Sequence, residues 1–138
     1  MKNNIESILI IGLGMIGASL ALASKSKGIK VFGYDSNDST VELAKKENFI
    51  DDSFNNLEVI NNNNLSDKID LVVVCVPPKQ TQEIFNNIHE LWNTSITITD
   101  TSSVKNHLKV NDVDNIILSH PIAGSDRSGL SAADSELY

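Results

Sequence analysis

The chain has 138 residues, of which 41% are hydrophobic and 21% are charged, the composition of an ordinary soluble globular domain. This length allows one domain with its own core but not two. The net charge of −7, with no cluster of Lys or Arg, argues against a nucleic-acid partner or an anionic membrane surface. No signal peptide precedes the first apolar run and no run is long enough to span a bilayer, so we expect a cytoplasmic protein.

Short apolar runs alternate along the chain with stretches of helical periodicity. The runs predict strands at residues 7–12, 30–35, 69–77, 95–100 and 115–119. The periodic stretches predict helices at 15–28, 38–49 and 79–92, and a helical turn or two at 104–110. Gly28 is expected to end the first helix, and Asp38 or Ser39 to cap the second. The asparagine-rich residues 52–68 predict a poor helix or a long loop. This alternation indicates parallel βαβ units, and hence a doubly wound α/β sheet with helices on both faces.

The first predicted strand runs directly into the pattern G-x-G-x-x-G, followed by a helix. Gly12 permits the tight turn, Gly14 lets a pyrophosphate approach the backbone, and Gly17 lets the helix press against the sheet. The second strand ends at Asp35, eighteen residues after Gly17, where a carboxylate can accept the ribose hydroxyls of NAD and repel a 2′-phosphate. The sequence therefore predicts a Rossmann-type NAD-binding domain. A flavin site, another ligand, or a glycine turn that binds nothing are the alternatives.

Cofactor contacts are expected from two regions of the chain. The predicted residues are Gly12, Leu13, Gly14, Met15, Ile16, Gly17, Asp35 and Ser36 in the first region, and Val76, Pro77, Pro78 and Thr81 after the central strand. Cys75, inside an apolar run, is read as a buried core residue. In such a sheet ligands bind outside the carboxyl ends of the strands, so the loops after residues 77, 100 and 119 should meet at one crevice.

His120 follows the last predicted strand and is a candidate acid/base residue. It shares that strand end with Asp126, and an imidazole beside a carboxylate is suited to taking a hydroxyl proton during hydride transfer. Ser103 could donate to the same substrate, or cap the helix predicted from Val104. His89 and His107 lie in predicted helices and are read as exposed surface residues.

Three motifs resemble the prephenate/arogenate dehydrogenase family of tyrosine biosynthesis. "IIGLGMIGASLALA" looks like its opening strand and helix, and "DTSSVK" like its D-x-G-S-V-K loop. "SHPIAGSDRSGLSAAD" resembles its G-H-P-[IM]-A-G-[ST]-E-x-S-G-x-x-A-A-D signature, which is the specific one. The resemblance covers essentially the whole chain and implies NAD-dependent oxidative decarboxylation of prephenate or arogenate.

The same resemblance implies roles for individual residues. His120 would accept the proton of the ring hydroxyl, Ser103 would contact the same oxygen, and Asp126 stands where the family has a glutamate of the substrate-side polar network. The sequence departs from the family at Asp126, one methylene shorter, and at Ser102 and Ser119, each in place of a glycine. These departures are expected to tighten a loop or alter substrate choice.

Residues 1–138 are expected to be the NAD-binding domain of a longer enzyme. The family continues into a helical domain that supplies homodimer contacts and cations for the substrate carboxylates; here Arg127, Lys79 and Lys105 are the candidate cations. The isolated chain is expected to bind NAD but to turn over little substrate. Two alternatives remain: another two-domain NAD-dependent dehydrogenase of the 3-hydroxyacid or imine reductase type, and a non-catalytic NAD-sensing module.

Overall fold

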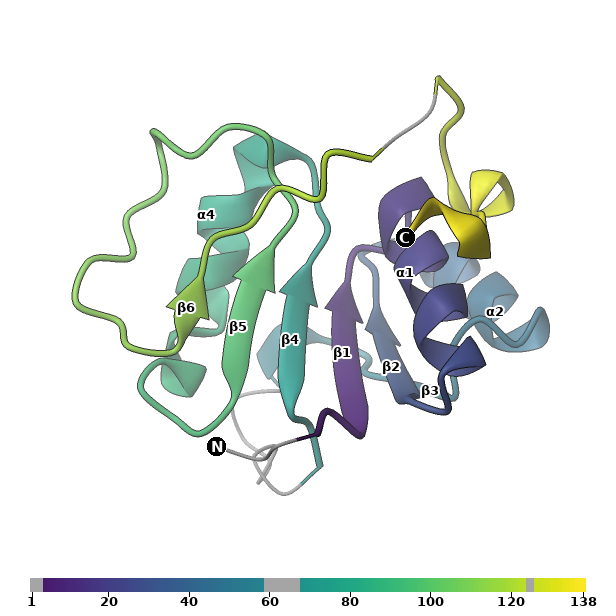
Figure 1. Ribbon diagram of the computed structural model, residues 1–138, viewed down its shortest axis with the longest axis horizontal. Coiled ribbons are helices and arrows are strands. Elements are labelled where there is room, and N and C mark those ends of the chain that lie inside the picture. The colour runs from purple at the N-terminus through teal and green to yellow at the C-terminus, as the bar shows by residue number, and fades with distance from the viewer. Residues whose placement is uncertain (1–3, 59–67, 124–125) are drawn as a thin grey trace.

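A computed structural model describes residues 4–58, 68–123 and 126–138 of the chain. Within these residues six strands form one parallel sheet, in the order β3-β2-β1-β4-β5-β6 (Figure 1). The strands are β1 (Ser7–Ile11), β2 (Lys30–Tyr34), β3 (Asp52–Ser53), β4 (Leu71–Val74), β5 (Thr97–Asp100) and β6 (Ile116–Ile117). The predicted doubly wound α/β fold is thereby confirmed.

Helices cover both faces of the sheet. The α-helices are α1 (Met15–Ser26), α2 (Asp38–Lys46) and α4 (Pro78–Asn87), and short 3-10 helices form at η2 (His89–Leu91), η3 (Leu130–Ala132) and η4 (Ser135–Leu137). Alternate residues of the fully buried β1 point to opposite faces. Ile8 and Ile10 pack in a cluster with residues of α1 and α2, whereas Leu9 and Ile11 pack in a second cluster that includes Phe85 of α4.

The strand order reverses beside β1, which lies between β2 and β4. In doubly wound sheets the crevice outside the carboxyl ends of the strands at such a point is the ligand site. The loop that starts α1 follows β1 directly, and the loop that starts α4 follows β4 directly. The topology therefore brings the glycine loop and the Pro77–Pro78 turn to the same place.

Several predicted element boundaries are corrected by the structure. Asn37 caps α2 in place of Asp38 or Ser39, because its side chain accepts the Ser39 N–H at 3.1 Å. Strand β3 was not predicted; its two polar residues pair with β2 through the backbone alone. Of the predicted loop at 52–68, residues 59–67 lie outside the described residues.

Of the helical turn or two predicted from Val104 to Val110, the structure shows only one hydrogen-bonded turn, in which the Leu108 N–H donates to the Lys105 carbonyl oxygen at 2.9 Å. Residues 104–110 form a turn and irregular backbone, because their polar groups bond outward to other elements. The Lys105 ammonium bonds to Asp100, a His107 ring nitrogen lies 2.7 Å from the Pro78 carbonyl oxygen, and the Lys109 N–H donates to the Gln82 side chain at 2.6 Å. Ser103 therefore caps no helix here.

Among the described residues no helix is long and apolar enough to cross a membrane. The end of the chain returns across the sheet to α1, where Leu130 is buried in the cluster beneath that helix. The Asp134 N–H donates to the Ser19 hydroxyl of α1 at 2.9 Å. The polar stretch after β6 thus passes over the carboxyl edge of the sheet, as Figure 1 shows for its described parts.

Candidate active site

The glycine loop adopts a conformation that two of its glycines make possible. Gly12 has φ +99°, and a Cβ there would lie 2.6 Å from the Cys75 carbonyl oxygen. A Cβ at Gly17 would lie 1.9 Å from the Gly12 carbonyl oxygen, so only glycine lets α1 start this close to β1. Around Gly14, by contrast, nothing lies within 4 Å of the Cβ position. That open side faces the cleft described below.

Asp35 fastens the glycine loop to the end of β2. One carboxylate oxygen accepts the Leu13 N–H at 2.8 Å and the other accepts the Asn37 N–H at 2.9 Å. Because each carboxylate oxygen has two lone pairs, two acceptor positions remain for ribose hydroxyls. Asp35 also lines a hollow beside α2 of about 390 Å³, with Asp38, Val41, Glu42, Lys45, Ser53, Phe54 and Asn55. Ser36 is exposed on the loop that follows.

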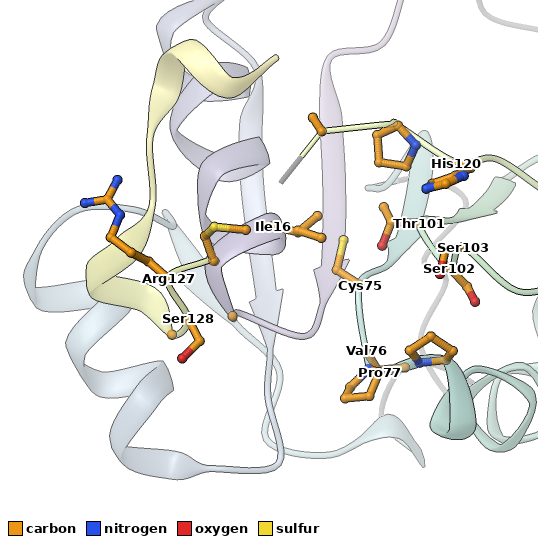
Figure 2. Close-up of a pocket in the computed structure, with 16 residues that line it drawn as sticks. Ile16, Cys75, Val76, Pro77, Thr101, Ser102, Ser103, His120, Arg127 and Ser128 are labelled. Atoms are coloured by element: carbon orange, nitrogen blue, oxygen red, sulfur yellow. The ribbon is translucent and has the colours of Figure 1, made fainter. Parts of the chain in front are cut away.

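A cleft of about 410 Å³ opens at the carboxyl ends of β1, β4 and β5 (Figure 2). Its lining comes from the start of α1, the turn before α4, the loop after β5 and the segment after β6: Gly14, Met15, Ile16, Cys75, Val76, Pro77, Pro78, Thr101, Ser102, Ser103, His120, Pro121, Ala123, Arg127, Ser128 and Gly129. The three loops predicted to share one crevice therefore do so.

The cleft contains eight of the predicted site residues, namely Gly14, Met15, Ile16, Val76, Pro77, Pro78, Ser103 and His120. Gly12 and Leu13 lie buried in the turn beneath it, and Gly17 lies buried in α1. Thr81 is also outside the lining, because it is buried in α4 with its hydroxyl lacking a hydrogen-bond partner among the described residues. Asp126 is exposed and does not line the cleft.

His120 and Asp126 do not form the expected pair. Among the described residues no hydrogen bond or ion pair joins the His120 imidazole to the Asp126 carboxylate. Figure 2 instead shows His120 on the same side of the cleft as Thr101, Ser102 and Ser103, with Arg127 on the opposite side. The residues labelled beside His120 in this view carry hydroxyl groups.

Two lining residues that sequence reasoning did not single out for the site are Thr101 and Cys75. The Thr101 hydroxyl donates to the Val74 carbonyl oxygen at 3.4 Å, and its position directly after Asp100 was the signal that could have found it. Burial raises the pKa of the Cys75 thiol to about 12, with the negative charge of Asp100 adding to the effect. The thiol therefore stays protonated at neutral pH, which argues against a nucleophile. Cys75 is only partly buried, because it packs against the cluster of Ile8 and Ile10 and also lines the cleft.

One candidate cation is already occupied. Lys105 forms an ion pair with Asp100 at 2.5 Å, and the Asp100 side chain is completely buried. A lysine held in this way is not available to a substrate carboxylate, whereas Lys79 lies exposed on α4. The candidate cations for a substrate carboxylate are therefore those other than Lys105.

The fold and the cleft together define a nucleotide-binding domain of the doubly wound α/β class. The family described as "Prephenate dehydrogenase, nucleotide-binding domain" matches residues 19–138, and the chain belongs to that family. The matched residues include the turn before α4, the loop after β5 and the segment after β6, all of which line the cleft, whereas the glycine loop precedes the match.

Curated relatives and a solved structure agree with this assignment. The chain is 32% identical to the prephenate dehydrogenase of Lactococcus lactis and 33% identical to the cyclohexadienyl dehydrogenase of Zymomonas mobilis, in each case over 96% of its own length. It spans only 38% and 46% of those two proteins. The structure of prephenate dehydrogenase from A. aeolicus with hydroxyphenyl propionate and NAD+ superimposes with a TM-score of 0.84 at 27% identity, covering 100% of this chain and 49% of that one.

Proposed function

We propose that this chain binds NAD in the carboxyl-edge cleft and supplies the nucleotide-binding domain of an enzyme that oxidatively decarboxylates prephenate or arogenate. The observation that carries the proposal is the meeting of Gly14 and His120 in one cleft of about 410 Å³. A nucleotide-binding loop and a proton-accepting side chain are the two parts that this reaction requires from the domain. The A. aeolicus relative, solved with NAD+, supports the choice of cofactor.

The residues present fit an NAD pyrophosphate. The open space at Gly14 lets a phosphate approach the backbone, and the first-turn N–H groups of α1 have no partner within the helix. Asp35 would accept ribose hydroxyls with its remaining lone pairs, and its negative charge would oppose a 2′-phosphate. Val76 and Pro77, which line the cleft between these groups and His120, would flank the cofactor.

The proposed chemistry needs little from the protein beyond placement and one proton acceptor. Bound NAD+ supplies the hydride acceptor. The His120 imidazole would hydrogen-bond the ring hydroxyl of the substrate and take its proton, and Ser103 would contact the same oxygen. Loss of CO₂ makes the ring aromatic, which drives the reaction without further acid/base groups.

We also propose that the complete enzyme contains a helical domain outside these 138 residues, which supplies homodimer contacts and cations for the substrate carboxylates. The chain spans less than half of the curated relatives it matches, which supports this arrangement. Light scattering of the complete gene product measures its oligomeric state. A monomer with full activity would contradict the homodimer.

The test is NADH production by the complete product of the gene, given NAD+ and either prephenate or arogenate. His120→Asn keeps a polar side chain of similar size but removes the proton acceptor, and we expect kcat to fall by about 10²- to 10⁴-fold. His89→Asn is the matched control, because His89 is exposed at the start of η2, after the end of α4, and does not line the cleft. The substrate with the higher kcat/KM decides between prephenate and arogenate dehydrogenase activity. Tight NAD binding without turnover on either substrate would refute the proposed chemistry while leaving the nucleotide site intact.

A further inference from the structure

One buried carboxylate connects the two loops that carry Ser103 and His120. Asp100, the last residue of β5, is 0% exposed. Its carboxylate accepts the Ser102 N–H at 3.0 Å and the Ser119 N–H at 3.1 Å, and it pairs with the Lys105 ammonium at 2.5 Å. A buried carboxylate is tolerated only when it is paired and hydrogen-bonded, and here all three partners come from those two loops.

The hydrogen bonds from Asp100 toward the segment after β6 end at the peptide bond that precedes His120. Sheet pairing of β6 stops at Ile117, which aligns with Thr99. Beyond it, Asp100 holds the Ser119 N–H, and the Ser119 hydroxyl donates to the Asp100 carbonyl oxygen. Lys105 donates to the Ser119 carbonyl, which belongs to the same peptide unit as the His120 nitrogen. The backbone entering His120 is therefore fixed by Asp100 and its ion-pair partner after the sheet has ended.

The hydrogen bonds from Asp100 toward the loop after β5 fix Ser102, the residue before Ser103. The Ser102 N–H donates to the Asp100 carboxylate, and the Ser102 hydroxyl donates to the Val104 carbonyl oxygen at 2.9 Å. Ser102 is 4% exposed, whereas Ser103 faces the cleft. The backbone on both sides of Ser103 is thus held from the buried side, which leaves the Ser103 side chain toward the cleft.

Both serines in this network stand where the family pattern has glycine. A glycine at position 119 would keep the hydrogen bond from the backbone N–H to the Asp100 carboxylate. It would lose the hydroxyl contacts to the Asp100 carbonyl oxygen and to the Thr99 hydroxyl, the latter 3.0 Å away. A glycine at 102 would lose the contact to Val104. The two departures therefore add side-chain hydrogen bonds to the positions that Asp100 already ties together.

We infer that Asp100 is a positioning residue that holds Ser103 and His120 on one side of the cleft, acting through Ser102, Ser119 and Lys105. The catalytic meaning of this placement rests on the proposed function, because that function gives Ser103 and His120 a shared substrate oxygen. Lys105 belongs to this network and does not bind a substrate carboxylate. Figure 2 shows the outcome, with Ser102, Ser103 and His120 grouped opposite Arg127.

The first experiment compares Asp100→Asn with Asp70→Asn in the complete gene product. Asp70 is a matched control, because it also accepts two backbone N–H groups, those of Glu6 at 2.9 Å and Ser7 at 3.1 Å, but at the amino edge of the sheet. Asparagine keeps one acceptor oxygen, replaces the other with a donor and leaves Lys105 without its counter-charge. We expect Asp100→Asn to lower kcat about tenfold or more with the KM for NAD+ within about twofold, and Asp70→Asn to leave both within about twofold. Equal losses of kcat in the two variants would overturn the inference.

The second experiment does not depend on turnover. In nitrogen-15 spectra of the 138-residue chain, Asp100→Asn should shift or broaden the His120 imidazole and Ser103 amide signals, while Asp70→Asn leaves them in place. Unchanged signals in Asp100→Asn would overturn the positioning role even if the enzyme is active. Shifted signals in an enzyme that oxidises neither substrate would support it and would refute only the proposed function.

A milder variant carries the test if Asp100→Asn does not fold. Ser119→Gly removes only the hydroxyl contacts and keeps the N–H bond to Asp100. We expect it to shift the same His120 signals by less and to lower kcat about two- to threefold at an unchanged KM for NAD+. Wild-type spectra and kcat in Ser119→Gly would contradict the inference.

Discussion

The substitution Gly14→Ala should weaken NAD+ binding by the glycine loop while leaving the stability of the fold nearly unchanged. The backbone of Gly14 has φ −73° and ψ −165°, which alanine adopts without strain, and no atom lies within 4 Å of its Cβ position. Two effects on stability oppose each other: alanine is a poorer N-cap than glycine, but it reduces the entropy of the unfolded chain by about 0.4–1 kcal/mol. We therefore expect the free energy of unfolding of Gly14→Ala to stay within about 1 kcal/mol of wild type.

The methyl group that Gly14→Ala adds would stand in the cleft at the start of α1, where the pyrophosphate of NAD+ has to reach the backbone. Losing one charge-assisted hydrogen bond from a phosphate costs about 1.5–3 kcal/mol. This corresponds to an increase of about 10- to 150-fold in the Kd for NAD+. Calorimetric titration of NAD+ measures the binding, and thermal unfolding of the same sample measures the stability.

Gly17→Ala is the contrasting variant. Its Cβ would lie 1.9 Å from the Gly12 carbonyl oxygen, so α1 or the turn has to move. Overpacking against backbone costs about 1–3 kcal/mol or more, and we expect a clear drop in Tm together with weaker binding. Wild-type affinity for NAD+ in Gly14→Ala would refute the placement of the pyrophosphate at this residue, and a large loss of Tm would refute the open space that the structure shows there.

Three further predictions follow from single side chains. Asp35→Asn should weaken NAD+ binding about tenfold or more and raise the affinity for NADP+ relative to NAD+, as titration with both cofactors will show. Burial raises the pKa of Cys75 from 9.0 to about 12, so iodoacetamide at pH 8 should modify it only in urea, and stability should fall as pH rises above 9.0, because the unfolded thiol ionises first. Burial alone would raise the pKa of Asp51, but the Val31 N–H and the Lys25 ammonium lower it below 3.8. The stability that Asp51 contributes is therefore present above pH 3.8 and lost as pH falls through its lower folded pKa, and urea unfolding at pH 7 and pH 3 should show a smaller acid loss in Lys25→Met.

The architecture was predictable because it depends on patterns that tertiary contacts do not change. A run such as residues 71–74 is apolar on both faces, which only a strand covered on two sides requires. In the G-x-G-x-x-G loop a side chain at Gly12 or Gly17 would collide with backbone atoms, so the pattern of glycines itself indicates this turn. Strand β3 gave no such signal, because its two residues, Asp52 and Ser53, bury no apolar side chain and pair through their backbone.

The helical turns predicted at residues 104–110 are mostly absent, for a physical reason that periodicity does not contain. Helix formation there would direct Lys105 and His107 along the helix surface, whereas the fold offers each a partner on another element. Lys105 has the buried Asp100 at 2.5 Å and His107 has the Pro78 carbonyl at 2.7 Å. Partners on other elements thus outweighed a weak local preference.

The site was predictable to the level of which loops meet, and no further. Parallel strands end at one edge, so the chain order alone brings the residues after β4, β5 and β6 together. Where each side chain lies depends instead on its own hydrogen bonds and ion pairs. Asp126, close to His120 in sequence, lies exposed outside the cleft. Asp100, twenty residues before His120, accepts the Ser119 N–H and so holds the peptide that leads into His120. A carboxylate that ends a buried strand beside a lysine five residues later is a sequence pattern that could have indicated this role. Because Asp100 is completely buried at the end of β5, its contact with the peptide before His120 is shielded from solvent.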